Sequence, residues 1–167
     1  MPSLKDVRGQ RSAPSLPFRA VMFLLDANVL IYAFRRDLPE HDRAKQWLEK
    51  NLVGTEPVGM LPLTELTFLR ISTNHRVFDE PSGLDEALRF LDSLRSSSAL
   101  TEVLPGPEHR YIFIRLAREY CLLGNDLTDA FIAAAAIETA ATLASADRGF
   151  ARFRGLRWID PLNVTAS

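Results

Sequence analysis

Apolar residues follow two patterns that alternate along the chain. Short runs in which nearly every position is apolar are typical of strands buried on both faces of a sheet. Longer segments with apolar residues about three or four positions apart are typical of helices that cover such a sheet. The short runs predict strands at 21–26, 56–61, 99–104, 141–147 and 156–160. The longer segments predict helices at 28–35, 39–52, 62–73, 82–96, 107–123 and 126–140.

Residues suited to helix ends mark several of these boundaries. Asn28 is a good N-cap for the helix at 28–35, and Pro62 suits the first turn of its helix. Gly124 suits the left-handed turn after the helix at 107–123. Strands that alternate with helices indicate a parallel sheet with helices on both faces. The sequence therefore predicts an α/β sandwich.

The first twenty residues differ from the rest of the chain. Residues 1–20 contain three prolines, few large apolar side chains and an excess of basic residues, without the apolar core of a signal peptide. We therefore expect a flexible N-terminal extension at 1–20, followed by a single domain at 21–167. No apolar run approaches the roughly 18 residues that a membrane span requires, so no membrane association is expected.

Composition narrows the function only slightly. The formal net charge is −1, from 20 Lys and Arg against 21 Asp and Glu, so no overall basic character points to a nucleic-acid partner. Seventeen of the basic residues are Arg, which suits bidentate phosphate contacts but also follows from a GC-rich genome. The single cysteine, Cys121, excludes an intrachain disulfide and fits the reducing cytoplasm.

Four acidic residues fall where predicted strands end or predicted helices begin. Asp26 ends the first strand, and Asp147 closes the strand at 141–147. Glu65 and Asp129 lie in the first turns of two helices. Because the carboxyl ends of parallel strands and the starts of the following helices face one edge of a sheet, we expect these side chains to converge there.

Each acid alone also fits an ordinary structural role. Asp126 and Asp129 are spaced like a capping box, Glu65 suits a first helical turn, and Asp26 and Asp147 suit turns. Several carboxylates at one edge, however, repel one another unless a cation lies between them. Mg²⁺ or Mn²⁺ prefers carboxylate oxygens and keeps waters that can attack a phosphodiester. Together the acids therefore predict a divalent-metal centre.

Four stretches of the sequence, in this order and at these separations, match a known family. They are "LLDANVLIYA", "LPLTELTFLRIST", "GNDLTDAFIAAAAIE" and "ATLASADRGFARFRGLRWIDP". From about Met22 to Leu162 the chain resembles a PIN-domain ribonuclease, and more specifically a VapC toxin of a bacterial toxin–antitoxin pair. The resemblance implies a three-layer α/β/α sandwich with a short central parallel sheet. It also implies Mg²⁺-dependent endonucleolytic cleavage of RNA.

The resemblance assigns roles to individual residues. Asn28 matches an Asn that helps to orient the first acid, and Ser145 matches a small hydroxyl residue two positions before the last acid. Members often carry another Asp two residues after the last acid, where this chain has Gly149. This departure leaves open how firmly a second metal ion is held. Asp126 is an extra acid that we expect to be a helix cap; the alternative is that it replaces the missing charge. The catalytic, metal-binding acids of the family fall on Asp26, Glu65, Asp129 and Asp147.

The resemblance also implies partners. Members of the family typically form homodimers and are inhibited by a small VapB-type antitoxin, whose tail occupies the acidic groove. Arg70, Arg76 and Arg148 are candidates for contact with the RNA substrate. One alternative is a PIN-like module that binds RNA or protein without cleaving it. The four acids argue against this alternative, because clustered negative charge repels phosphate.

Overall fold

The computed structural model describes residues 21–163, and the extension expected at 1–20 lies outside them. Within the described range the strands form one parallel sheet in the order β3-β2-β1-β4-β5. The central strand is β1, so the residue that follows it, Asp26, lies in the middle of the carboxyl edge. The strands are β1 (Phe23–Leu25), β2 (Val58–Met60), β3 (Leu100–Glu102), β4 (Thr142–Ala144) and β5 (Arg157–Ile159).

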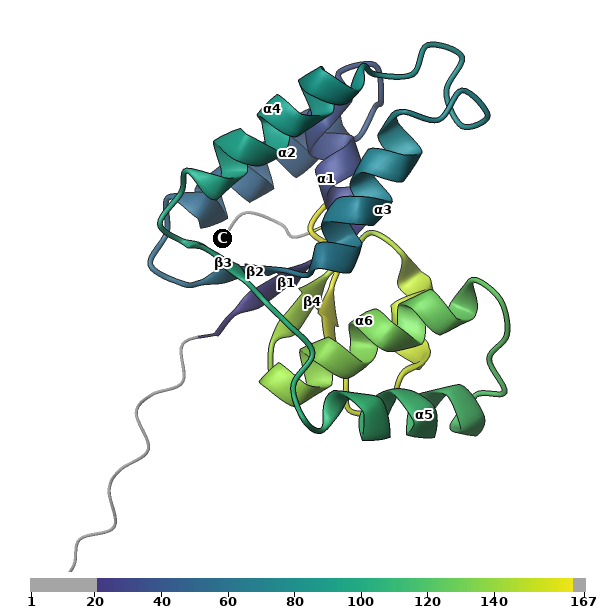
Figure 1. Cartoon of the computed structure of the whole chain (residues 1–167). Coiled ribbons are helices and arrows are strands. Elements are labelled where there is room, and N and C mark those ends of the chain that lie inside the picture. The colour runs from purple at the N-terminus through teal and green to yellow at the C-terminus, as the bar shows by residue number, and fades with distance from the viewer. Residues whose placement is uncertain (1–20, 164–167) are drawn as a thin grey trace, which may run out of the picture.

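Helices cover both faces of this sheet (Figure 1). Side chains alternate between the faces along β1, so Leu25 contributes to the core under α1–α4 and Leu24 to the core under α5 and α6. This arrangement confirms the predicted three-layer α/β/α sandwich with a short parallel sheet. Within residues 21–163, no helix combines the length and the apolar character needed to cross a bilayer. The helices are α1 (Ala27–Phe34), α2 (His41–Leu52), α3 (Pro62–Ser72), α4 (Leu84–Arg95), α5 (His109–Glu119) and α6 (Asp126–Thr139), with a 3-10 turn η1 (Arg148–Arg152).

Helix α6 packs against the sheet mainly through alanines. Its alanine side chains are at most 1% exposed and belong to the same core as Leu24 of β1 and Leu143 of β4. Small side chains let a helix approach the strands closely without leaving voids. The helix is therefore firmly seated, and its first turn brings two acids to the carboxyl edge. The buried alanines are Ala130, Ala133, Ala134, Ala135 and Ala136.

The structure corrects the predicted end of one helix. The helix expected at 107–123 is shorter, and the left-handed turn after it falls on Cys121, with a φ of 51°, rather than on Gly124. The backbone amide of Leu122 donates to the carbonyl of Ala117 at 2.9 Å, which closes the last turn of α5 early. Gly124 also has a positive φ, 57°, but it lies in the segment that leads into α6.

Candidate active site

Asp26 is the most buried acid of the site and begins α1. It is 9% exposed, and its carboxylate Oδ1 accepts from the backbone amide of Ala27 at 2.7 Å. The other oxygen, Oδ2, accepts from Ser145 Oγ at 2.7 Å and from Asn28 Nδ2 at 2.8 Å. Asp26 is therefore the N-cap of α1, and the prediction that Asn28 caps this helix is wrong. Asp26 caps the helix because its backbone is extended at the end of β1, which is the conformation typical of an N-cap residue.

Ser145 links the two central strands behind Asp26. Its hydroxyl is fully buried, donates to Asp26 and accepts from Asn28 Nδ2 at 2.9 Å and from the Asp147 amide at 3.1 Å. One donated and two accepted bonds use the whole capacity of a hydroxyl group. Asn28 Oδ1 in turn accepts from the Ala146 amide at 3.2 Å. Both predicted orienting residues thus contact Asp26, although their roles toward a metal remain predictions.

Asp147 lies on the turn between β4 and η1. Its Oδ1 accepts from the Gly149 amide at 2.7 Å and caps η1. A Cβ atom added at Gly149 would lie 3.0 Å from this oxygen, so the small residue leaves room for the capping carboxylate. Among residues 21–163, no donor is bonded to the other oxygen, Oδ2. Asp147 therefore keeps one carboxylate oxygen available toward the edge of the sheet.

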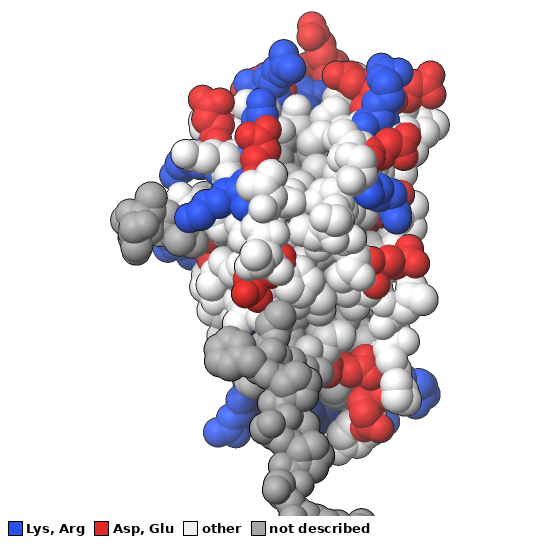
Figure 2. All heavy atoms as spheres, turned by 90° about the vertical axis from the view of Figure 1, so that its left-hand side faces the viewer, with Lys and Arg blue, Asp and Glu red and all other residues white. Residues whose placement is uncertain are grey.

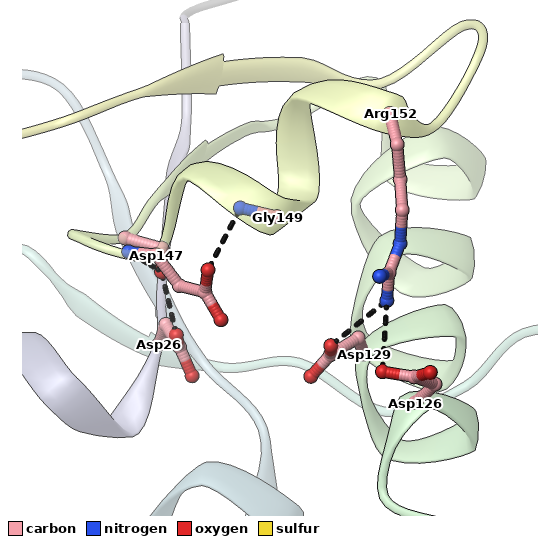
Figure 3. A network of polar contacts seen from close by, with 7 residues as sticks. Asp26, Asp126, Asp129, Asp147, Gly149 and Arg152 are labelled. Carbon is pink, nitrogen blue, oxygen red and sulfur yellow. Dashed lines mark hydrogen bonds and ion pairs between the residues drawn. The ribbon is translucent and has the colours of Figure 1, made fainter. Parts of the chain in front are cut away.

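Asp129 reaches the same space from the first turn of α6 (Figure 3). Its pKa is raised to about 6, chiefly by burial and then by the charge of Asp147; Arg152 opposes the rise, and Asp26 and Asp126 add to it. The pKa of Asp26 is also raised, chiefly by burial, against the bonds from Ser145 and Ala27 and with a contribution from Asp147. Because these charges influence one another, the structure brings three of the four predicted acids together.

Asp126 makes no capping hydrogen bond, so the expected cap role is wrong for this residue. Instead Arg152 Nη2 lies 3.3 Å from Asp126 Oδ1 and 3.1 Å from Asp129 Oδ2 (Figure 3). The neighbouring residue Asn125 occupies the cap position in helical backbone, which leaves the Asp126 carboxylate to point toward η1. Asp126 thus adds a negative charge beside Asp129, and Arg152 binds both.

Glu65 stands apart from the other three acids. The first turn of α3 is tied to the end of β1, since Thr64 Oγ1 donates to the carbonyl of Leu25 at 3.0 Å. The Glu65 carboxylate, however, forms an ion pair with Arg95 at the end of α4. Its charge is not among the influences that raise the pKa values of Asp26 and Asp129. The expected convergence of four acids is therefore found for three of them.

The donor set suits a hard divalent cation, but the side chains are not gathered around one point. The raised pKa values of Asp26 and Asp129 come chiefly from burial, with the charge of Asp147 as an added cause, and a nearby cation would oppose both. Within residues 21–163, no group of His, Cys, Asp or Glu side chains is arranged to hold a metal ion as it stands. Asp129 is turned to Arg152 and Asp147 to the Gly149 amide. Each of these two carboxylates has one oxygen engaged and, among residues 21–163, one without a hydrogen bond, so a cation would have to draw the side chains toward a common point.

The sequence did not predict the two arginines that pair with the acids, Arg95 and Arg152. Both contacts depend on how separate elements meet in space. The spacing of residues along the sequence therefore gives no signal for Arg95. For Arg152 the one hint is that it follows Asp147 closely in the sequence. The arginines that were predicted to contact RNA, namely Arg70, Arg76 and Arg148, are exposed.

The fold and the facing acids define a class of small α/β domains with acids at the carboxyl edge of a parallel sheet, and a family model identifies the family. The model, described as the PIN domain, matches residues 23–156. The chain therefore belongs to the PIN-domain family.

Within that family its relatives are VapC ribonucleases. The chain is 44% identical over 142 residues to Ribonuclease VapC43 of Mycobacterium tuberculosis, which covers 85% of this chain and 97% of that protein. A VapC ribonuclease of Mycobacterium bovis matches with the same identity and coverage. Ribonuclease VapC31 of M. tuberculosis is 37% identical over 140 residues, 84% of this chain and 99% of that protein. These relatives confirm the resemblance to VapC proteins found in the four stretches.

Solved structures agree on the fold at lower sequence identity. VapBC2 from Rickettsia felis, bound to a DNA fragment from its promoter, has a TM-score of 0.62 at 17% identity, and covers 83% of this chain and 98% of that chain. M. tuberculosis VapC20, described as a toxin that cleaves the sarcin–ricin loop, has a TM-score of 0.58 at 14% identity, and covers 81% and 98%. At these identities the likeness supports the shared fold.

Proposed function

We propose that this chain is a VapC-type endoribonuclease toxin that cleaves RNA with the help of Mg²⁺ or Mn²⁺. The observation that carries the proposal is the approach of Asp26 and Asp129 to Asp147, whose charge adds to the rise that burial causes in the pKa of both residues. Such a set gains little as a plain structural feature and becomes favourable when a cation joins it. The names of the relatives, which are ribonucleases, support RNA as the substrate.

The proposed metal ligands are the four acids predicted from the sequence. They differ in how firmly each is held and in how directly it would contact the cation. Asp26 is held by Ser145 and Asn28 and would meet a cation without reorganising. Asp129 and Asp147 would supply further oxygens from α6 and from the β4–η1 turn. Glu65, paired with Arg95, would act farther out. A bound Mg²⁺ supplies a Lewis acid that lowers the pKa of water and offsets the charge on the phosphate.

RNA contact is proposed for Arg70, Arg76 and Arg148. All three are exposed, and within residues 21–163 none of them forms an ion pair with an acid. Arg148 directly follows Asp147, so its guanidinium is tethered beside the acids. On the side of the molecule in Figure 2, acidic and basic residues are intermixed rather than segregated. The face seen there thus offers no broad basic surface.

A small VapB-type antitoxin and a second copy of the chain are the proposed protein partners, in the cytoplasm. Large apolar side chains are exposed beside the acidic edge, with Leu66 at 60% and Leu123 at 81%. A hollow of about 1690 Å³ also lies between α2, α4 and the end of α1. The two leucines and this hollow, which charged, polar and apolar side chains line together, are the proposed contact surfaces for these partners. Light scattering of the chain alone, and of the chain expressed with its neighbouring gene, tests both partners.

The second candidate is a PIN-like module that binds RNA or protein without cleaving it. The observation in its favour is that, in the part of the chain that is described, the acids are not gathered around a metal position. A binder would retain RNA with and without divalent cations and would leave it intact. A nuclease would cut it only when the cation is present.

A cleavage assay with Mg²⁺ separates the two candidates. Asp26→Asn removes the fixed carboxylate while keeping its shape, and should lower cleavage of a structured RNA at least about a hundredfold. Asp42→Asn is the matched control, since it makes the same chemical change at an exposed position on α2 and should leave the rate unchanged. Equal rates for the two variants, or cleavage that survives EDTA, would contradict the proposed function.

A further inference from the structure

Arg152 contacts the acidic site from its α6 side. Its guanidinium spans two carboxylates of α6, at 3.1 Å from Asp129 Oδ2 and 3.3 Å from Asp126 Oδ1 (Figure 3). The same guanidinium lies 4.8 Å from the centre of the Phe153 ring, and the side chain is 34% exposed. Arg152 therefore reaches the two acids from η1 with its side chain partly buried.

The local charge balance makes this contact significant. Asp26, Asp126, Asp129 and Asp147 bring four negative charges to the site, and among residues 21–163 Arg152 is the one cation paired with any of them. A guanidinium and a divalent cation both seek carboxylate oxygen, and their like charges repel at short range. The Asp129 oxygen bound by Arg152 cannot at the same time serve a cation fully.

We propose that Arg152 is a resident counter-cation of this site, which holds Asp129 in the metal-free protein and gives it up when a divalent cation binds. The inference rests on the proposed function in one respect, that Asp129 is a metal ligand. Asp126 gives the released guanidinium a place to remain, because Arg152 already contacts it. The Phe153 ring keeps the arginine close to the site. Arg152 is thus a positioning residue, and a divalent cation binds Asp129 by taking the place of its guanidinium.

The exchange predicts a change in metal affinity that needs no RNA to measure. Binding of Mn²⁺ is followed by the electron paramagnetic resonance signal of the free ion, with the full-length chain. Arg152→Gln should bind Mn²⁺ about three- to tenfold more tightly than the wild-type chain, because one competing charge is removed from the site. Arg154→Gln is the matched control: it removes the same charge two residues away, where the side chain pairs with no acid among residues 21–163.

Thermal unfolding gives a second reading. Without metal, Arg152→Gln should unfold at a lower temperature than the wild-type chain, because the acids lose their counter-charge. Added Mn²⁺ should restore more stability to Arg152→Gln than to either the wild-type chain or the Arg154→Gln control. A residue that merely supported the fold would lower the unfolding temperature equally with and without Mn²⁺, and would not tighten Mn²⁺ binding.

Each outcome decides the matter. Tighter Mn²⁺ binding by Arg152→Gln alone supports the exchange, as does binding by this variant when the wild-type chain shows none. Unchanged or weaker binding by Arg152→Gln, or the same tightening in Arg154→Gln, overturns the exchange while leaving the metal-dependent function in place. If neither the wild-type chain nor Arg152→Gln binds Mn²⁺, the exchange and the proposed metal centre are both overturned.

Discussion

The two sides of the candidate site are built in different ways. Around Asp26, buried hydrogen bonds from Ser145, Asn28 and the Ala27 amide fix the carboxylate. Across from it, Asp129 is 28% exposed and is held by an ion pair with Arg152. Buried and fully satisfied networks are rigid, whereas partly exposed ion pairs contribute little and exchange readily. The comparison indicates that the β1–β4 side fixes where a cation would lie and the α6 side adjusts to it.

A substitution on the rigid β1–β4 side of the site should lower the free energy of unfolding more than one on the α6 side. Ser145→Ala would remove three buried hydrogen bonds of the Ser145 hydroxyl: the one it donates to Asp26 and the two it accepts from Asn28 Nδ2 and the Asp147 amide. We expect the free energy of unfolding to fall by about 2–3 kcal/mol, measured by urea denaturation of the metal-free protein. Ser93→Ala is the control, since Ser93 makes one exposed bond to Phe90 on α4, and should change stability by less than about 0.5 kcal/mol. Similar losses in both variants would show that the Asp26 network is not the rigid half.

The stability that the adjustable α6 side contributes should depend on pH. Asp129 has a folded-state pKa of about 6, above the ordinary value of 3.8, so the folded chain binds this proton more tightly than the unfolded chain. The stability it contributes is full below about pH 4 and is lost as pH rises through about 6. Metal-free Asp129→Asn should therefore be more stable than the wild-type chain near pH 7, by about 1 kcal/mol after allowing for solvent screening, and should match it near pH 4.

The control for this pH dependence is the exposed Asp42→Asn variant, which should follow the wild-type curve at all pH values. Thermal unfolding across the pH range measures all three proteins. A variant Asp129→Asn that is less stable than the wild-type chain near pH 7 would mean that the ion pair with Arg152 outweighs burial. The α6 side would then be anchored rather than adjustable.

The outlying acid should matter least to stability. Glu65 and Arg95 form an ion pair in which the arginine side chain is 42% exposed. Arg95→Gln should lower the free energy of unfolding by less than about 1 kcal/mol, as measured by denaturant melts. Lys45→Gln, which breaks an exposed pair with Glu49 on α2, is the matched comparison and should behave alike. A much larger loss for Arg95→Gln would place Glu65 in the rigid part of the site.

Sequence rules predicted the parts of the site that depend on chain topology. Asp26 and Asp147 follow parallel strands and Asp129 lies in the first turn of a helix, so their meeting at one edge follows from the order of elements. The pairing of Asp129 with Arg152 depends instead on how η1 lies over α6. A local pattern cannot supply such a contact between elements.

The same distinction holds for helix ends and for the outlying acid. Asn28 is a good cap by composition, but Asp26 lies two residues earlier in extended backbone, and its carboxylate caps the helix. Glu65 was placed correctly in the first turn of α3, yet the direction of its side chain is set by Arg95 from α4. The predicted division into an extension at 1–20 and a domain at 21–167 remains a prediction.

The central claim is that Asp26, Asp129 and Asp147 together bind one divalent cation. Crystals of the chain grown with Mn²⁺ near neutral pH test it directly, through the anomalous scattering of the metal. We predict a single strong peak with oxygens of Asp26, Asp129 and Asp147 around it and Arg152 turned away from Asp129. A peak elsewhere on the protein, or none at Mn²⁺ concentrations that saturate the enzyme, would contradict the claim.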